Sequence, residues 1–389
     1  MVVASRVLLR ASCVLVGGLA GAPCLAAGAG IWIAPEELAA LPTEGPAWQN
    51  LLAAAALPVE RPDLSDQEDP VNVRVLANAL VFARTGDPAR RARVVEACRA
   101  AMGTEAGGRT LALGRELLAY VVAADLVGLP PEDDRRFRAW LRGVRAQKLG
   151  GRTLVSTHEQ RPNNWGTHAG ASRMAVAAYL GDRVDLDRAA RVLRGWLGDR
   201  SAWTGFRFGK PWWQADPGEP VGVNPKAATK QGHSIDGVLP DDQRRAGPFA
   251  WPPPRTNYTW GALQGAFAQA VILDRAGYDV WGWQDRALLR AVRWLQEVAR
   301  QPARGDDAWI LHLVNYHYGT DFPAPVPAEA GKNAGFTDWT HGRPRRSLPR
   351  GRGRPRAARA GGARGARAAR CAGSLILGAA AAGRPSRGR

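Results

Sequence analysis

The stretch RPNNWGTHAGASRMAVAAYL, residues 161–180, predicts the fold most directly. It favours a helix from Asn163 to Leu180, since asparagine at a helix start can cap the free N–H groups of the first turn. Asn164 and His168 are four residues apart and therefore share a face of this helix. A buried amide beside an imidazole needs hydrogen-bond partners or a ligand, so this helix start is also a candidate site.

Helical patterns continue on both sides of this stretch, separated by Gly-rich or Pro-containing breaks. The sequence predicts a short helix starting at Pro35 and helices over residues 48–57, 71–85, 90–102, 111–126, 132–149, 186–197, 260–276 and 283–300. Residues 205–254 lack periodicity and predict a long loop, a kind of segment that is often functional. Few runs alternate, so a sheet should be minor or absent.

Many paired helices with short connections predict an all-α fold of helical hairpins, an (α/α) toroid or incomplete α/α barrel. No repeat of 34 or 40 residues is present, which argues against regular solenoids. The chain has 389 residues, of which 46% are hydrophobic, enough for a sizeable core. Its four cysteines exclude a disulfide scaffold.

Positive charge is concentrated at the two ends of the chain. The formal net charge is +18, but residues 341–389 hold 14 Arg and no Lys, Asp or Glu. Removing these, together with Arg6 and Arg10, leaves about +2 for the body, so nucleic acid is not an expected partner. Residues 342–389, almost entirely Arg, Gly, Ala and Pro, predict a disordered or frameshift-like tail, although Arg352–Arg356 resembles a minor-groove-binding arm.

Residues 1–29 predict a cleaved signal peptide, with a positive start, a small apolar stretch and a small-x-small cleavage site. The apolar stretch is short for a membrane span. We therefore expect a secreted or periplasmic protein without a membrane span after cleavage, whose catalytic domain is residues 30–341.

The motifs of several enzyme classes are missing from the sequence. It contains no Gly-rich phosphate loop, no HExxH, no Cys/His zinc spacing and no GxSxG. These absences argue against nucleotide enzymes, zinc proteases and α/β-hydrolases, and neither a cofactor nor a metal site is expected.

A second group of motifs follows the long loop. It consists of DGVLPDDQRR, residues 236–245, and then YTWGAL, residues 258–263. Together with the Asn pair, these segments resemble the alginate lyase family of helical-toroid polysaccharide lyases, in the same order along residues 31–340. The departure is Trp165, which stands directly after the Asn pair where the family has His.

The resemblance implies β-elimination from an anionic polysaccharide, a polyuronate. It assigns stabilisation of the substrate carboxylate to Asn164 and Arg245, and proton transfer to Tyr258. His168, one turn after the Asn pair, would be the base or would neutralise the carboxylate. A phenol needs a nearby cation to act as a base near neutral pH, and Arg245 is the candidate.

Other residues are predicted to bind substrate, each with a structural alternative. Asn163 could cap the helix, and Trp165 takes the place of the family His. Trp212 and Trp213 in the long loop could stack on sugar rings or pack the loop. His233 could bind substrate or form a hydrogen bond within the loop. These further candidates are Trp212, Trp213, His233, Arg244 (if the register shifts by one), Tyr316 and His317.

Two other functions stay open at this point. A toroid glycoside hydrolase would need two carboxylates in its cleft, for which Asp236, Asp241 and Asp242 are candidates. Trp165 at the His position is compatible with a polyuronate-binding protein that has lost catalysis.

Overall fold

The computed structural model describes residues 30–342. The predicted signal peptide, residues 1–29, and the predicted tail from residue 343 onward lie outside the described residues and stay predictions. No helix within the described range is long and apolar enough to cross a membrane.

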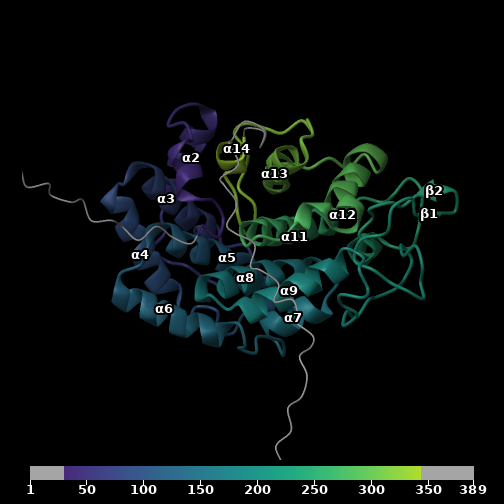
Figure 1. Ribbon diagram of the computed structural model, residues 1–389, viewed down its shortest axis with the longest axis horizontal. Helices are drawn as coiled ribbons and strands as arrows, with labels where there is room; N and C mark the ends of the chain where they lie inside the picture. Colours follow the sequence, from purple (N-terminus) through teal and green to yellow (C-terminus); the bar gives the residue numbers. More distant parts are fainter. Residues whose placement is uncertain (1–29, 343–389) are drawn as a thin grey trace, which may run out of the picture. The chain divides into compact units, whose positions relative to one another are not determined.

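Nine helices make up the first half of the described chain (Figure 1). They are α1 (Pro35–Ala39), α2 (Pro46–Ala56), α3 (Val71–Thr85), α4 (Pro88–Ala101), α5 (Thr110–Val127), α6 (Pro131–Val144), α7 (Leu154–Gln160), α8 (Asn164–Leu180) and α9 (Arg183–Trp196).

The second half, up to residue 342, has five α-helices, short helical turns and one small hairpin. The α-helices are α10 (Pro240–Gln243), α11 (Tyr258–Arg275), α12 (Trp283–Arg293), α13 (Trp309–Tyr318) and α14 (Thr337–Thr340). The short turns are η1 (Arg244–Ala246), η2 (Val280–Gly282), η3 (Trp294–Val298) and η4 (Gly305–Asp307). Strands β1 (Thr229–Lys230) and β2 (His233–Ser234) pair antiparallel, with Thr229 opposite Ser234.

The predicted all-α class is confirmed, and the described sheet is limited to the two-residue strands β1 and β2. Successive helices pack as hairpins, α2 against α3, α3 against α4 and α8 against α9. This arrangement is consistent with the predicted incomplete α/α toroid.

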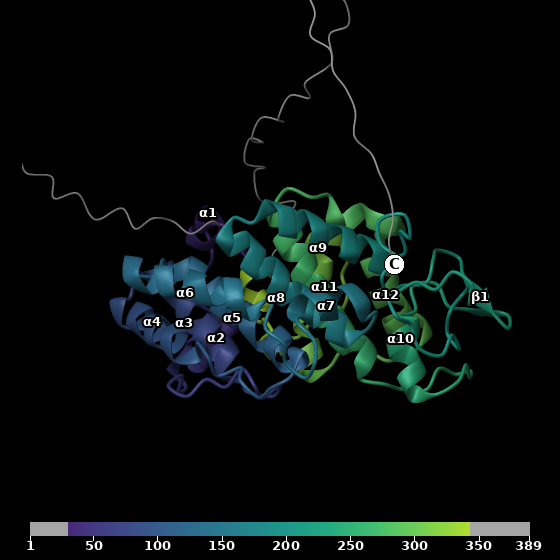
Figure 2. The ribbon, with the colours of Figure 1, turned by 90° about the horizontal axis from the view of Figure 1, so that it is seen from below.

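Helix α8 lies in the middle of the fold, between α5 and α11 (Figures 1 and 2). Most of its side chains are buried, as expected for a helix that contacts neighbours on several faces. Its Ala and Gly residues permit close packing. Gly265 of α11 is one such contact point, because a Cβ there would lie 2.4 Å from the carbonyl carbon of Thr167. The middle of α11 is thereby held close to the first turn of α8.

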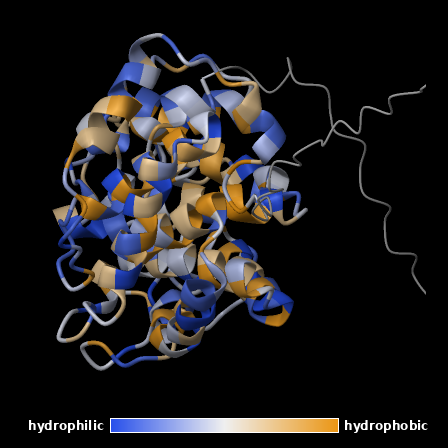
Figure 3. Ribbon diagram, turned by 90° about the vertical axis from the view of Figure 1, so that its left-hand side faces the viewer, coloured by the Kyte–Doolittle hydropathy of each residue, from blue (hydrophilic) through white to orange (hydrophobic). Residues whose placement is uncertain are grey.

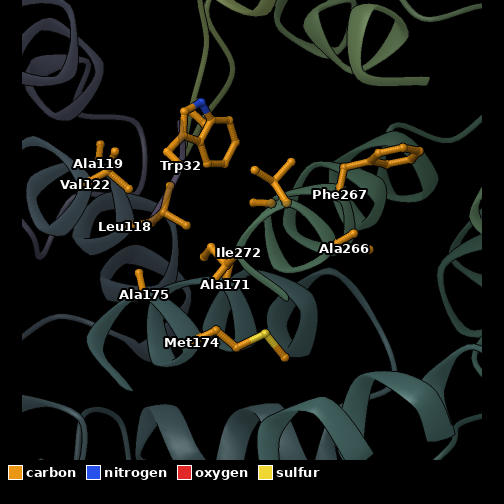
Figure 4. Packing of buried hydrophobic residues seen from close by; sticks show 14 of the residues in the cluster. Trp32, Leu118, Ala119, Val122, Ala171, Met174, Ala175, Ala266, Phe267 and Ile272 are labelled. Carbon is orange, nitrogen blue, oxygen red and sulfur yellow. The ribbon is translucent and has the colours of Figure 1, made fainter. Parts of the chain in front are cut away.

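The hydrophobic core runs along these central helices. Leu118 of α5, Ala171, Met174 and Ala175 of α8, and Ile272 of α11 are all buried (Figure 4). Hydrophobic segments lie mainly where helices face one another, and polar segments lie mainly on the outer faces (Figure 3). The two central contacts of α8 therefore rest on small and aliphatic side chains.

Two predicted helices extend several residues beyond the C-terminal ends of the observed ones. The helix predicted over residues 132–149 ends at Val144, and a turn with a backbone bridge between Leu149 and Arg152 follows. The helix predicted over residues 283–300 changes to a π turn at Trp294. In both cases the apolar pattern continues past the point where the backbone hydrogen bonds change.

Helix α7 is an element that the sequence analysis did not identify. It spans seven residues, too few for a clear periodic pattern. Thr153 caps it by accepting a hydrogen bond from the backbone N–H of Ser156 at 2.9 Å, and the Ser156 hydroxyl accepts one in return from the backbone of Thr153. This reciprocal cap is the local signal that indicates the helix.

Candidate active site

The Asn pair begins helix α8, and two aspartates of the long loop hold it in place. Asn163 is the N-cap and accepts a hydrogen bond from the backbone N–H of Trp165 at 3.2 Å. Its amide also donates to Asp241 Oδ2 at 2.9 Å. The backbone N–H of Asn164 donates to Asp242 Oδ1 at 3.0 Å. The predicted cap is confirmed, and these bonds join the two motifs of the sequence.

A polar pocket of about 280 Å³ opens beside this junction. It brings together two of the residues that the resemblance assigned to catalysis, Asn164 and Tyr258, from the starts of α8 and α11. Its lining residues are Arg115, Asn164, Arg255, Thr256, Asn257, Tyr258, Trp260, Gly261, Gln301, Pro302, Arg304, Asp306, Asp307 and Lys332.

Asn164 carries an unused hydrogen-bonding group at this pocket. Its side chain is 3% exposed, and its Oδ1 atom has no hydrogen-bond partner among the described residues. A buried polar atom without a partner is costly, of order 1–3 kcal/mol. Oδ1 is an acceptor and does not bind an anion, so the N–H₂ group of the Asn164 amide is the part that can donate a hydrogen bond to an anionic ligand in the pocket.

Tyr258 is the first residue of α11 and is 39% exposed. The guanidinium carbon of Arg245 lies 4.0 Å from the centroid of its ring. The contact that the sequence predicted between this cation and the phenol is therefore present. The positive charge over the ring can stabilise negative charge on the phenol during proton transfer.

His168 does not line the pocket. It is fully buried, and neither ring nitrogen has a hydrogen-bond partner of normal geometry among the described residues. Burial and the positive charges of Arg115 and Lys332 lower the pKa of His168 well below its usual range, while the backbone of Gly261 acts in the opposite direction. The imidazole is therefore neutral behind the pocket residue Gly261.

The less exposed cations of the pocket are already bound to carboxylates. Arg115 contacts Glu68 at 2.7 Å, and Lys332 bridges Glu68 at 3.1 Å and Asp306 at 2.9 Å. The pocket also contains two exposed guanidinium groups, Arg255 and Arg304.

Asp307 is a titratable group of the pocket that the sequence analysis missed. Burial raises its pKa to about 7, and the nearby Asp306 acts in the same direction. A hydrogen bond of 2.8 Å from Gln264 to its Oδ1 atom, and the positive charges of Lys332 and Arg255, oppose this effect. Asp307 therefore changes charge near neutral pH, where catalytic groups commonly titrate.

Arg115, Arg255, Arg304 and Asp306 were missed as well. None of them belongs to the motifs around the two helix starts, and their surroundings in the sequence give little indication of a site. The available signal was a pair of acidic residues, Asp306 and Asp307, directly before the apolar residues that form α13.

The predicted substrate-binding residues of the long loop lie outside the set that lines the pocket. Arg244 forms a salt bridge with Asp241 at 2.8 Å. Trp213 is fully buried and donates to the carbonyl of Gly247 at 3.1 Å, so it packs the loop and cannot stack on a sugar.

Two further residues of this region have structural surroundings. Trp212 is partly buried and packs against the hydrophobic core. His233, in β2, stacks on Trp251 with 4.3 Å between ring centroids. The stacking partner of His233 is thus another side chain of the loop region.

Tyr316 and His317 lie at the C-terminal end of α13, whereas Asp306 and Asp307 of the pocket precede its first residue. The ring of His317 stacks on Trp281 at 3.8 Å, and Tyr316 packs edge-on against His341 at 4.9 Å. Both residues therefore belong to an aromatic cluster and are not part of the pocket lining.

The carboxylates considered for a hydrolase are engaged elsewhere. Asp236 is bound to Arg290 at 2.5 Å, and Asp241 is bound to Arg244. Asp242 is fully buried, and burial raises its pKa well above the usual range. None of the three lines the pocket.

Among residues 30–342, no group of three or more His, Cys, Asp or Glu side chains is arranged to hold a metal ion. The chemistry available to the pocket residues is hydrogen bonding, positive charge, a phenol and a carboxyl group that titrates near neutral pH.

Comparison with known proteins gave one informative result. No curated protein and no solved structure matches the chain significantly. The model of one family does match, over a region that includes the Asn pair and helices α5 to α9 but not Arg245 or Tyr258. This match, of residues 101–205 to the family described as Alginate lyase, supports the assignment of the chain to the alginate lyase family of polysaccharide lyases.

Proposed function

We propose that the protein is an exported lyase that cleaves a polyuronate, such as alginate, by β-elimination. The observation that carries this proposal is the meeting of three residues from separate segments. Asn164 and Tyr258 line one polar pocket, and Arg245 lies against the ring of Tyr258. Export rests on the signal-peptide pattern of residues 1–29.

The first requirement of the reaction is stabilisation of the substrate anion. The proton at C5 of a uronate is a very weak acid, and its removal places negative charge on the neighbouring carboxylate. The side-chain amide of Asn164 can donate a hydrogen bond to that carboxylate from within the pocket. The exposed guanidinium groups of Arg255 and Arg304 add positive charge at the same pocket.

The second requirement is transfer of a proton. A base takes the proton from C5, the C5–H electrons form a double bond between C4 and C5, and the bond from C4 to the linking oxygen breaks. The leaving oxygen then takes up a proton. In this proposal Tyr258 acts at both positions, first as phenolate and then as phenol, and the guanidinium of Arg245 over its ring stabilises the phenolate.

His168 has an indirect role in this proposal. It is enclosed and neutral, so it does not exchange a proton with substrate from its observed position. Its imidazole packs behind Gly261, between the starts of α8 and α11, and supports the pocket from there.

Absorbance spectroscopy tests the proposal, because the unsaturated uronate formed by elimination absorbs in the ultraviolet. The full-length chain is incubated with polymannuronate, polyguluronate, alginate or polyglucuronate. We expect absorbance to rise with at least one polymer and not to rise with Tyr258→Phe. A folded wild-type protein that produces no absorbance with any of them would contradict the proposal.

A second candidate function, binding of polyuronate without cleavage, is favoured by one observation. Trp165 occupies the position of the family His, and the nearest imidazole, His168, is enclosed. Binding measured by calorimetry, with neither new absorbance nor new reducing ends, would support this alternative. New reducing ends without absorbance would indicate hydrolysis instead.

A further inference from the structure

Two guanidinium groups lie on aromatic rings beside the start of α8. The guanidinium carbon of Arg161 is 5.0 Å from the ring centroid of Trp165, and that of Arg245 is 4.0 Å from the ring centroid of Tyr258. We call Arg161 and Arg245 the arginine pair. Trp165 directly follows Asn164, and Tyr258 lines the pocket, so the pair adjoins the candidate active site.

The arginine pair differs from the other guanidinium–ring contacts of the described residues in its charge balance. Each of four other arginines on a ring is also bound to a carboxylate within 4 Å. These ion pairs are Arg138 with Asp134, Arg183 with Asp187, Arg188 with Glu159 and Arg194 with Asp199. Neither member of the arginine pair has a carboxylate at that distance within residues 30–342.

The two charges also influence each other. Burial and the positive charges of Arg152 and Arg245 lower the pKa of Arg161, against the effect of Asp241. Cations held close together repel one another, and an anion bound between them removes that cost. The arrangement therefore favours an anionic ligand.

The backbone holds Arg161 in place before any ligand binds. Arg161 is the C-cap of α7, and its backbone N–H donates to Thr157 at 3.0 Å. Its carbonyl oxygen packs so closely on the first turn of α8 that a Cβ at Gly166 would lie 1.9 Å from it. The following residue, Pro162, accepts a hydrogen bond from Trp196 at 3.0 Å. Such preorganisation lowers the entropy lost on binding.

We propose that the arginine pair binds the carboxylate of the uronate next to the one that is cleaved, so that the protein selects chains with carboxylates on consecutive sugars. A planar guanidinium can bind a carboxylate with two parallel hydrogen bonds. This inference rests on the proposed function, and it adds Arg161 as a specificity-determining residue.

Arg161→Gln tests the inference because it removes the charge and keeps a side chain of similar length. On a polymer of consecutive uronates we expect KM to rise about tenfold and kcat to change less than twofold. On a polymer in which uronate alternates with a neutral sugar, KM should stay within twofold. The ratio of kcat/KM between the two polymers should therefore fall about tenfold.

Arg188→Gln is the matched control, since Arg188 lies 5.4 Å from the ring of Trp203 but is neutralised by Glu159. It should leave KM within twofold for both polymers. Melting curves establish that both variants are folded. An unchanged selectivity ratio in a folded Arg161→Gln protein, or the same loss in Arg188→Gln, would overturn the inference.

A binding measurement separates this inference from the proposed function. Titration of a uronate tetrasaccharide into Tyr258→Phe, with and without Arg161→Gln, should show about tenfold weaker binding in the double variant. This difference, together with a wild-type protein that shows no lyase activity on any polymer, would support the arginine pair and reject the proposed function. Lyase activity with equal binding by the two variants would reject the arginine pair alone.

Discussion

The less exposed cations of the pocket and the arginine pair adjoin each other, yet they differ in how their positive charge is balanced. In the pocket, the buried Arg115 and the partly buried Lys332 are bound to Glu68 and Asp306. The arginine pair has aromatic rings and no carboxylate within 4 Å among the described residues. Cations that are already neutralised shape a pocket, whereas cations without a counter-ion are available to an anionic substrate. The comparison predicts that loss of the pocket amide, Asn164, lowers mainly kcat, whereas loss of Arg161 raises mainly KM.

The largest effect is expected for the pocket amide. Asn164→Ala should lower kcat about 10²–10³-fold with a smaller effect on KM, because it removes a donor to the charge that develops during proton abstraction. Steady-state kinetics on the preferred polymer measures this. Asn78→Ala is the control, since Asn78 is a buried amide outside the pocket that donates to the Arg74 carbonyl at 2.9 Å. Equal losses in both variants would contradict a catalytic role for Asn164.

Arg244 and Arg245 are adjacent in the chain and allow a direct comparison. Arg244 is bound to a carboxylate, and Arg245 has none within 4 Å among the described residues. Arg245→Gln should lower kcat/KM about 10–100-fold, since it removes a charge-assisted contact to the substrate and the cation over Tyr258. Arg244→Gln should lower the free energy of unfolding by about 1–3 kcal/mol, because it leaves Asp241 with fewer partners. Its effect on kcat/KM should be threefold or less. The reverse ranking in kinetics and denaturation would refute the comparison.

The stability of the folded protein should decrease in acid because two histidines, His158 and His168, are buried. Burial lowers the pKa of both His158 and His168 well below 6.5. Below about pH 6.5 the unfolded chain binds protons at these residues and the folded protein does not. The free energy of unfolding should therefore decrease as pH falls, by up to about 1.4 kcal/mol per pH unit for each His.

Urea denaturation at pH 7, 6 and 5 measures this dependence. His168→Asn should lose about half of the slope and retain the part that comes from His158. A slope equal to that of the wild type would show that folding does not lower the pKa of His168.

The smallest effect concerns the charge of Asp307. Its pKa of about 7 means that the carboxyl is neutral at lower pH and ionised at higher pH. An ionised Asp307 repels a uronate carboxylate, so KM should rise severalfold between pH 6 and pH 8. Asp307→Asn should keep KM nearly constant over this range. A KM that rises equally in both proteins would assign the pH dependence to another group.

Local features of the sequence predicted much of the fold. Helix α3 occupies the residues predicted for it, and Gly86 ends it in the left-handed conformation. Asn163 caps α8 as expected. Helix α7 was missed, because seven residues carry little periodicity. Such features involve neighbours along the chain, and this is why the sequence alone indicates them.

The candidate site could be predicted only in part. Asn164, Arg245 and Tyr258 were identified from motifs, and the structure brings them together. Asp307 and Arg255 of the same pocket were missed, since no motif contains them. Trp213 was considered for sugar stacking, and packing against the loop buries it completely.

The sequence by itself determined where most helices begin and end, and which residue types stand at their starts. Only the tertiary structure decided which residues act together. It encloses His168 behind the pocket, binds Arg244 to Asp241, and leaves Arg245 against Tyr258 with no carboxylate within 4 Å among residues 30–342. The physical reason is that helix ends depend on hydrogen bonds between neighbours in the chain. Burial and ion pairing depend on distances between segments that only packing brings together.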